Sequence, residues 1–287
     1  MARQPLVARR AEELLDASVV ATSPVAGGDI ATATRLRLST GQTALMKTLP
    51  HAPEGFFEAE AAGLRWLSEV QDGVPLPEVL AAASDCVILA WIEQSSKTPP
   101  EAAATFGQQL ARTHAAGADD WGLDHDGFIG RLPLPNRTAP TWPEFYATRR
   151  VLPYLKLARD RGAITDGDAA AVEAVVGRLT DLFPEEAPAR LHGDLWNGNC
   201  LWGQDLAIHV IDPAAYGGHR EVDLAMLHLF GLTHLPRVVA AYDEVHPLAD
   251  GWEDRLGLHQ LVPLLVHACM FGGSYGARAG AIAARYA

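Results

Sequence analysis

Two segments in the second half of the chain place acidic and amide side chains at fixed spacing between short apolar runs. LHGDLWNGNCLW covers residues 191–202, and VIDPAAYGG covers residues 210–218. The first segment holds Asp194 and, five positions later, Asn199, while the second holds Asp212 at the end of an apolar run. Short β-forming runs flank the first segment, so the pattern predicts a polar loop followed by a hairpin.

These three side chains match what phosphoryl transfer from ATP requires. A carboxylate must accept the proton of the attacking hydroxyl, and an amide oxygen with a second carboxylate must hold Mg²⁺ on the phosphates. The protein-kinase catalytic loop spaces its base and its Asn in the same way. We therefore predict a kinase that uses ATP and Mg²⁺, with Asp194 as the catalytic base and Asn199 and Asp212 as metal ligands.

The sequence also bears on the kind of acceptor. His-Gly-Asp stands where protein kinases have His-Arg-Asp, and the Arg of that motif commonly contacts a phosphorylated activation segment. Only a few residues separate Asp212 from the next predicted helix, which leaves no room for such a segment. This favours a small-molecule acceptor.

Composition limits the alternatives. The 287 residues are 48% hydrophobic and 20% charged, which suffices for a sizeable core. The net charge of −12 disfavours a binder of nucleic acid or anionic membrane, since such proteins need a basic face. Cys86, Cys200 and Cys269 form no C-x-x-C motif and are expected to be buried thiols in a reducing compartment. Because the first residues lack an apolar signal region, we expect a cytoplasmic protein. We also expect a monomer that contacts neither nucleic acid nor membrane.

The hydrophobic pattern changes from β-type to helical near residue 93. A helix over 7–16 precedes three predicted strands between residues 18 and 49, a helix over 53–70 and two β segments within 80–92. Helices are then predicted over 99–116, 142–161, 166–183, 221–229, 236–245 and, with interruptions, from 255 onward, and the β signals of this half flank only residues 191–202. This order predicts an α+β fold of the two-lobe protein-kinase type. A small antiparallel β-sheet N-lobe with one main helix takes residues 1–92, a larger helical C-lobe takes residues 93–287, and nucleotide binds between them.

Three features of the first lobe fit a nucleotide site. Gly27 and Gly28 separate the first two predicted strands and would let the backbone approach phosphates, although a plain hairpin turn is the alternative interpretation. Lys47 lies in the third predicted strand. In the helix that follows, Glu60 shares the apolar face with Phe57, so its carboxylate needs a partner, and Lys47 is the natural one. Such a pair would hold the α- and β-phosphates of ATP, whereas a surface-exposed Glu60 is the alternative.

The hinge and one aromatic residue complete the predicted site. Ala90, Trp91 and Ile92 end the last predicted N-lobe strand, and their backbone groups would bind adenine. Trp196, two residues after Asp194, would either stack on the sugar face of the acceptor or pack against the helical lobe. By contrast, we assign structural roles to His192, which would bond the loop backbone, and to Asp223, which would cap a helix and brace the catalytic loop.

With these residues in place, the chain resembles the fructosamine kinase (ketosamine-3-kinase) family, which is related in fold to aminoglycoside phosphotransferases and choline kinases. HGDLWNGN and IDPAAYGGHREVDLAM are similar to the family's catalytic and metal segments. Further similar segments are LARTHAAGADDWGLDHDGFIG, PNRTAPTWPEFYATRRVLPYLKLARDRG and FGGSYGARA, so the resemblance covers nearly the whole chain. Thr113, Trp121, Val151, Asn197 and Ala90 depart from the residues usual at these positions.

The resemblance implies phosphorylation of the 3-hydroxyl of fructosamines, the ketoamines that form when glucose or ribose reacts with amines. The phosphorylated adduct decomposes and frees the amine, so the implied role is deglycation repair, on free ketoamines or glycated proteins. Carried over by position, Asp194 is the acceptor base, Lys47 the ATP lysine, residues 90–92 the hinge, and Asn199 and Asp212 the metal ligands. Two alternatives stay open: a kinase for another hydroxylated amine such as an aminoglycoside, choline or homoserine, and a pseudokinase that binds nucleotide without catalysis.

Overall fold

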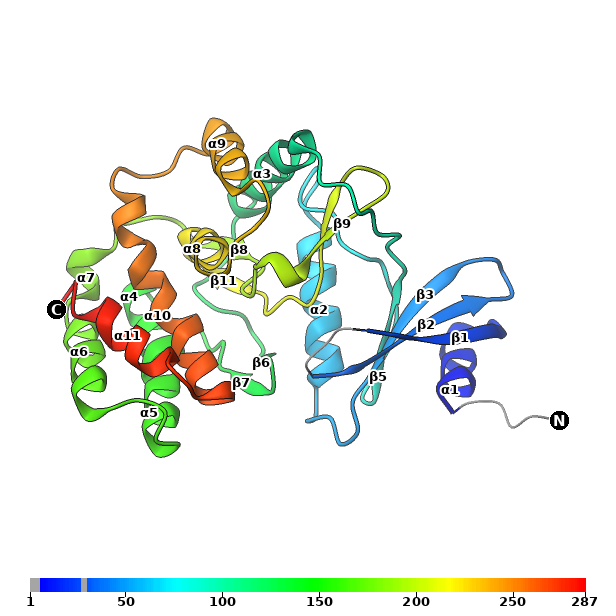
Figure 1. The fold of residues 1–287 in the computed structure, drawn as a ribbon, viewed down its shortest axis with the longest axis horizontal. Helices are drawn as coiled ribbons and strands as arrows, with labels where there is room; N and C mark the ends of the chain where they lie inside the picture. Colours follow the sequence, from blue (N-terminus) through cyan, green and yellow to red (C-terminus); the bar gives the residue numbers. More distant parts are fainter. Residues whose placement is uncertain (1–5, 27–29) are drawn as a thin grey trace.

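The computed structural model describes residues 6–26 and 30–287, so the predicted phosphate-loop residues Gly27 and Gly28 lie outside the described residues. Figure 1 shows a lobe that contains a β-sheet beside a larger, mostly helical lobe. The predicted α+β fold with two lobes is confirmed. Within the described ranges, none of the helices combines the length and the apolar character that crossing a membrane requires.

The N-terminal lobe is built on a five-stranded antiparallel sheet in the order β1-β2-β3-β5-β4. Its strands are β1 (Val19–Val25), β2 (Thr32–Leu38), β3 (Thr43–Thr48), β4 (Val79–Ala83) and β5 (Cys86–Ala90), and its helices are α1 (Leu6–Leu15) and α2 (Phe56–Ser68).

The two helices cover opposite faces of this sheet. Met46 of β3 belongs to the hydrophobic cluster that contains Ala11 of α1, whereas Leu89 of β5 belongs to the cluster that contains Phe57 of α2. Because successive residues of a strand point to opposite faces, Lys47 lies on the face that α2 covers. The sheet therefore presents the predicted ATP lysine to the helix that carries its predicted partner.

Helix α2 also lies close to the C-terminal lobe. A Cβ added to Gly63 would lie 3.2 Å from the Cβ of Ala215 and 3.5 Å from the Cγ of Pro213. A larger side chain at this position would therefore force the two segments apart. The glycine lets α2 pack directly on the segment that follows Asp212, which links the N-lobe helix to the predicted metal site.

The C-terminal lobe is mostly helical, with three small antiparallel pairs of strands. Its helices are α3 (Pro100–Ala115), α4 (Trp142–Phe145), α5 (Leu152–Asp160), α6 (Asp166–Val176), α7 (Leu179–Leu182), α8 (Glu221–Phe230), α9 (Leu235–Val245), α10 (Trp252–Phe271) and α11 (Tyr275–Ala283). The strand pairs are β6 (Gly127–Ile129) with β7 (Leu132–Leu134), β8 (Ala189–Leu191) with β11 (Tyr216–Gly218), and β9 (Cys200–Trp202) with β10 (Ile208–Val210).

Some sequence expectations for this lobe were wrong. The hairpin β6–β7 was not predicted, because strands of three residues are too short to show an alternating pattern. The single helix expected over 166–183 is divided into α6 and α7 at Gly177. The helix expected over 142–161 contains a π-helical segment, Tyr146–Val151, between α4 and α5.

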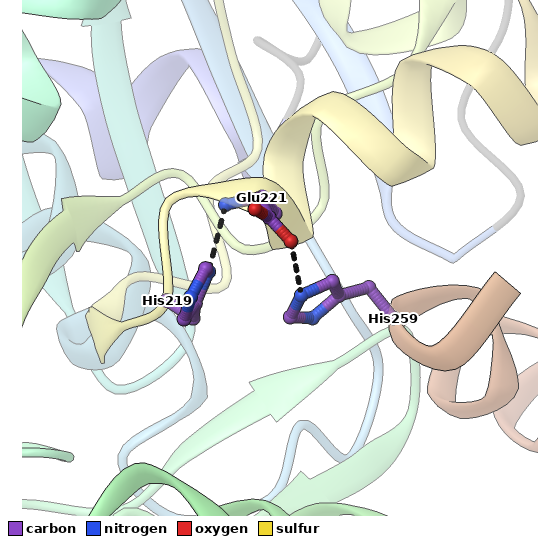
Figure 2. Close-up of side chains that lie close together, drawn as sticks. All are labelled: His219, Glu221 and His259. Carbon is purple, nitrogen blue, oxygen red and sulfur yellow. Dashed lines mark hydrogen bonds and ion pairs between the residues drawn. The ribbon is translucent and has the colours of Figure 1, made fainter. Parts of the chain in front are cut away.

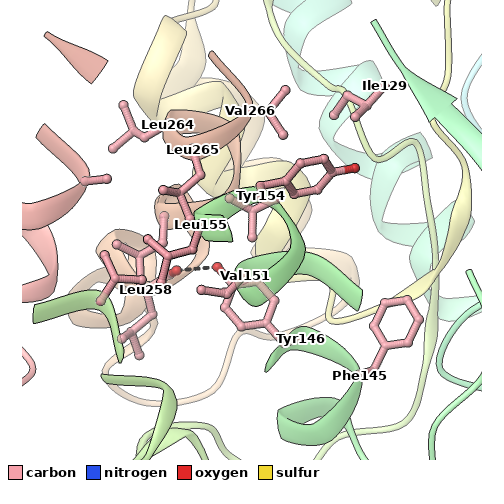
Figure 3. Close-up of a cluster of buried hydrophobic side chains, with 14 of the residues drawn as sticks. Ile129, Phe145, Tyr146, Val151, Tyr154, Leu155, Leu258, Leu264, Leu265 and Val266 are labelled. Atoms are coloured by element: carbon pink, nitrogen blue, oxygen red, sulfur yellow. Dashed lines mark hydrogen bonds between the residues drawn. The ribbon is translucent and has the colours of Figure 1, made fainter. Parts of the chain in front are cut away.

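The largest hydrophobic core lies in the helical lobe. Figure 3 shows part of it, which includes side chains of β6, α4, the π-helical segment, α5 and α10. The hydroxyl of Tyr146 donates a hydrogen bond to the carbonyl of Leu258, which satisfies a buried polar group inside this core. Cys86, Cys200 and Cys269 are buried and free, as the sequence predicted.

We propose that the boundary between the lobes lies between residues 92 and 93. Immediately after that point, the carbonyl of Glu93 accepts a hydrogen bond from the N–H of Gln204 at 2.9 Å, and Gln94 forms a β-bridge with Gly203. The chain thus leaves the N-lobe sheet and at once joins the hairpin β9–β10 of the helical lobe.

Candidate active site

A cavity of about 650 Å³ lies between elements of the two lobes. Lys47 and Glu60 line it from the N-terminal lobe, and Asp194, Asn199 and Asp212 line it from the C-terminal lobe. The remaining described candidates also line this cavity, namely Ala90, Trp91, Ile92 and Trp196. Lys47 and Asp212, which are 165 positions apart in the sequence, therefore meet in one cleft.

Lys47 is held between two carboxylates. Its Nζ lies 2.7 Å and 2.8 Å from the two carboxylate oxygens of Glu60 and 2.9 Å from Oδ1 of Asp212. The Glu60 side chain is only 9% exposed, so this carboxylate is not a surface charge. Burial acts to lower the pKa of Lys47, but the attraction of Glu60 and Asp212 outweighs it and raises the pKa, so the ammonium stays charged.

A glycine is required in the turn before Asp194. Gly193 has φ +80°, a left-handed conformation, and a Cβ added there would lie 2.1 Å from the carbonyl oxygen of Ala214. Any side chain would collide with this fixed backbone atom. The glycine of the His-Gly-Asp motif is thus dictated by the close approach of the loop to the segment after Asp212.

Asn199 fixes the carboxylate of Asp194. Its Nδ2 donates to the main-chain oxygen of Asp194 at 2.8 Å and to Oδ2 of Asp194 at 3.2 Å. Burial raises the pKa of Asp194 to about 7, and repulsion from Asp212 adds to this effect, while the bond from Asn199 opposes it. A carboxylate with a pKa near neutrality suits a proton acceptor that works at physiological pH.

The donor set around Asp212 fits a hard divalent cation. Asp212 has φ +56°, an uncommon conformation for a residue with a side chain, and its carboxylate is 40% exposed. The preceding residue, Ile211, donates its N–H to the carbonyl of Asn199 at 3.0 Å, which ties the two segments together. Because Nδ2 of Asn199 is engaged by Asp194, its amide oxygen remains available alongside the Asp212 carboxylate, and such oxygens are ligands that Mg²⁺ prefers.

Asp223 braces the loop that carries Asp194. This fully buried carboxylate accepts hydrogen bonds from the backbone N–H groups of His192 (2.8 Å) and Gly193 (2.9 Å), and its Oδ2 lies 3.2 Å from Nε2 of His114. Burial acts to raise the pKa of Asp223, but these partners outweigh it and lower the pKa. The imidazole of His192 bonds the carbonyl of Ile211 at 2.9 Å, in keeping with the structural role expected for it.

The predicted hinge has fewer free backbone donors than the sequence suggested. The N–H of Ala90 donates to the carbonyl of Glu78 at 2.8 Å, and the N–H of Trp91 donates to the carbonyl of Thr43 at 3.2 Å. Among the described residues, nothing accepts a hydrogen bond from the N–H of Ile92. Of the three predicted residues, Ile92 is therefore the one whose backbone can donate to an adenine ring.

The position of Trp196 is compatible with both roles that the sequence left open, stacking on the acceptor and packing against the helical lobe. Its ring makes an edge contact with Phe230 at 6.2 Å between centroids, so one part of it packs against the helical lobe. The half-buried side chain also lines the cleft. A Cβ added to Gly198 would lie 2.3 Å from the indole, which shows that the loop folds closely against the ring. Stacking of Trp196 on an acceptor stays a prediction.

A second cluster of titratable groups lies at the start of α8. Figure 2 shows His219, Glu221 and His259, whose candidate ligand atoms lie within 4.8 Å of one another. Arg255 already donates to both oxygens of Glu221, at 2.6 Å and 3.1 Å, and Nε2 of His259 lies 3.2 Å from Oε2. A metal ion would have to displace this arginine, and none of the three residues lines the cleft. We therefore assign the cluster to the stability of the α8 N-terminus.

Sequence reasoning missed one wall of the cleft. The hairpin β6–β7 contributes Gly127, Phe128 and Ile129 to the lining, and the segment after it contributes Asn136. These residues carry no periodic pattern and no charged motif. Only the spatial position of the hairpin identifies them as part of the site.

Comparison with known proteins agrees with this geometry. A family model described as "Fructosamine kinase" matches residues 4–286. A "probable ketoamine kinase" of Thermus thermophilus is 36% identical over 253 residues, which cover 88% of each chain. A solved structure of a candidate fructosamine-3-kinase from Thermobifida fusca superposes with a TM-score of 0.92 and 48% identity, covering 98% of this chain and 99% of the other.

A more distant solved structure shows the fold alone. A choline kinase from Streptococcus pneumoniae superposes with a TM-score of 0.66 at 16% identity, with 98% of each chain covered. The two-lobe architecture is thus shared with phosphotransferases whose sequences differ widely from this one.

Proposed function

The chain belongs to the fructosamine kinase family, and from this premise we propose that it transfers the γ-phosphate of ATP to the 3-hydroxyl of a ketosamine. The observation that carries this proposal is the meeting of Lys47, Asp194, Asn199 and Asp212 in one cleft. The relatives supply the acceptor class, since they bear the names of ketoamine and fructosamine kinases.

Asp194 acts on the acceptor hydroxyl. Its carboxylate is fixed by Asn199 and has a pKa near 7, so it can orient the hydroxyl and accept its proton as the new bond forms. The bond from this oxygen to the γ-phosphorus forms while the bond between the γ-phosphorus and the bridging oxygen of ADP breaks. The proton therefore ends on Asp194, and ADP leaves with the electron pair of the broken bond.

The N-terminal lobe positions the nucleotide. Lys47 is charged and accessible from the cleft, so it can bind phosphate oxygens while Glu60 holds it in place. The free N–H of Ile92 donates to the adenine ring. Asn199 and Asp212 would hold Mg²⁺, which neutralises charge on the phosphates when bound. We include Gly27 and Gly28 among the phosphate-binding residues on sequence grounds alone.

The same proposal includes the acceptor contact of Trp196, the location of the protein and its partners. We propose that Trp196 contacts the sugar of the acceptor, because it lines the cleft two residues after the base. We propose a cytoplasmic location, in keeping with three buried free thiols. We also propose a monomer that acts on small ketoamines or on ketoamines attached to proteins, with no nucleic-acid or membrane partner.

The test is an ATP-consumption assay with Mg²⁺ and fructosyl-lysine or ribulosyl-lysine, run with the wild type and with Asp194→Asn. Turnover of a ketosamine by the wild type, lost in the variant, supports the proposal. Turnover of choline, kanamycin or homoserine without turnover of either ketosamine would overturn the acceptor class. ATP binding without turnover of any of these acceptors would instead indicate a pseudokinase.

A further inference from the structure

Arg150 is a buried cation that pairs with no carboxylate. It is 1% exposed, and it takes part in none of the ion pairs that the described residues form. Its guanidinium lies over the rings of Phe145 (4.6 Å) and Tyr216 (3.8 Å), and it donates to the carbonyl of Pro135 and, at 2.6 Å, to Oδ1 of Asn136. Burying a charge without a counter-charge is costly, so these neutral partners must be held firmly in place.

The bond from Arg150 sets the orientation of the Asn136 amide. Arginine offers only donors, so the atom that faces it must be the amide oxygen, and the amide cannot be turned around. The backbone of Asn136 is also fully engaged, because its N–H donates to Asp126 at 2.7 Å and its carbonyl accepts from Leu123 at 2.9 Å. Three of the four polar groups of this residue are therefore paired inside the protein.

The fourth group, Nδ2, is left for a ligand. In the part of the chain that the structure describes, no atom accepts a hydrogen bond from Nδ2, although Asn136 is only 1% exposed. Asn136 lines the cleft, and a Cβ added to the cleft residue Gly127 would lie 3.6 Å from Nδ2. Among the described residues, Nδ2 is not one of the fully buried side-chain atoms that lack a partner, so it is open to the cleft. It can therefore donate to an oxygen that a ligand brings into the cleft.

The position of Asn136 favours the acceptor over the nucleotide. The ring of Tyr216, on which Arg150 lies, is also in contact with the catalytic loop, since a Cβ on Gly193 would lie 3.1 Å from it. Asn136 is thus connected through two side chains to the residue before Asp194. The proposed nucleotide contacts, by contrast, come from the N-terminal lobe.

We propose that Asn136 is a specificity-determining residue of the acceptor site, which donates a hydrogen bond from Nδ2 to an oxygen of the ketosamine sugar, and that Arg150 is the positioning residue that orients it. This inference rests on the proposed function and names one contact within it. The contact gives the sugar part of the acceptor, rather than its amine part, a fixed polar partner.

Two variants separate this contact from a structural role. Asn136→Asp keeps an oxygen for Arg150 but removes both N–H donors, and Asn136→Ala removes the side chain without adding charge. We expect each variant to raise the KM for fructosyl-lysine about tenfold, as loss of a neutral hydrogen bond in a buried site does, with the KM for ATP unchanged. Gln42→Glu, an exposed amide-to-acid change in the turn between β2 and β3, is the matched control and should leave both constants unchanged.

The outcomes distinguish failure of the proposed function from failure of the proposed Asn136 contact. If the wild type turns over no ketosamine, the proposed function fails. If the wild type is active and either Asn136 variant keeps the wild-type KM for fructosyl-lysine, Asn136 does not bind the sugar and this inference fails. Should Asn136→Asp melt early, Asn136→Ala decides the question. Equal increases in the KM values for ATP and ketosamine would show a general distortion of the cleft and would also overturn the assignment.

The role of Arg150 is tested through the same constants. Arg150→Lys retains the charge but cannot both bond Asn136 and cover the Tyr216 ring, so we expect the same selective rise in the KM for fructosyl-lysine. In the double variant with Asn136→Ala, Arg150→Lys should add little to that rise, because its effect passes through Asn136. Fully additive effects would show that Arg150 does not act through this residue.

Discussion

Asp223 accepts a hydrogen bond from the backbone N–H of Gly193 at 2.9 Å, so the first turn of α8 holds the residue that precedes the proposed base. The two residues are 30 positions apart in the chain. A carboxylate suits this place because it can accept several N–H groups at once, and the backbone of His192 supplies a second one. The orientation of the loop that carries the proposed base therefore depends on a contact from helix α8.

Asp223→Asn should destabilise the protein and reduce its activity. The amide of Asn offers one oxygen in place of two and turns its N–H₂ group toward one of the two backbone donors, His192 or Gly193. We expect a loss of about 3 kcal/mol in the free energy of unfolding, measured by urea denaturation, and a fall in kcat of tenfold or more. Asp181→Asn, on the exposed surface of α7, is the control. An unchanged urea midpoint would show that the brace contributes no stability.

Asp194→Asn should abolish turnover but leave nucleotide binding intact. The substitution removes the proton acceptor and keeps the size of the side chain, so kcat should fall by about 10² to 10⁴. Calorimetric titration with ADP should give a dissociation constant within about twofold of the wild type, because Asp194 is not among the proposed nucleotide contacts. Residual activity close to that of the wild type would mean that another group takes the proton.

Glu60→Gln should weaken the use of ATP selectively. The amide cannot neutralise Lys47, which then remains paired with Asp212 alone and is drawn toward the proposed metal ligand. We expect the KM for ATP to rise about tenfold and the KM for the acceptor to stay unchanged, as measured in steady-state kinetics. Glu58→Gln, at an exposed position of the same helix, is the matched control. Equal effects of Glu60→Gln and Glu58→Gln would show that the ion pair between Lys47 and Glu60 does not determine the KM for ATP.

Acidification should destabilise the protein through His219. Burial, with repulsion from His259, lowers the pKa of His219 well below 6.5, so the folded state holds it neutral. The unfolded chain binds a proton at this residue below about pH 6.5, so its contribution to stability is complete above that pH and is lost as the pH falls. Each such group changes the unfolding free energy by up to about 1.4 kcal/mol per pH unit.

A variant isolates that contribution. His219→Asn keeps an acceptor for the N–H of Glu221 but has no titrating group. Its unfolding free energy, measured by urea denaturation between pH 7.5 and 5, should fall less steeply with acid than that of the wild type. His51→Asn, at an exposed position, should retain the wild-type slope. Parallel slopes for His219→Asn and the wild type would exclude His219 as a source of the acid sensitivity.

The sequence by itself determined the fold class and indicated which side chains are candidates for the chemistry. Asp194, Asn199 and Asp212 lie within one loop and one hairpin, so their relative positions follow from short sequence separations. Such a pattern can be recognised directly in the sequence. The same holds for Glu60, whose place on the apolar face of α2 follows from helical periodicity and leads to Lys47. The burial of the three cysteines was also predicted from composition and spacing.

Only the tertiary structure decided which groups remain free to act. The sequence presented Ala90, Trp91 and Ile92 as equal, but cross-strand and loop bonds occupy the first two N–H groups. It assigned no role to Asn136, whose free donor exists because Arg150, 14 positions away, engages the oxygen of the same amide. Whether a donor is free depends on hydrogen-bond partners that are distant in the sequence. Such partners produce no periodic pattern from which they could be predicted.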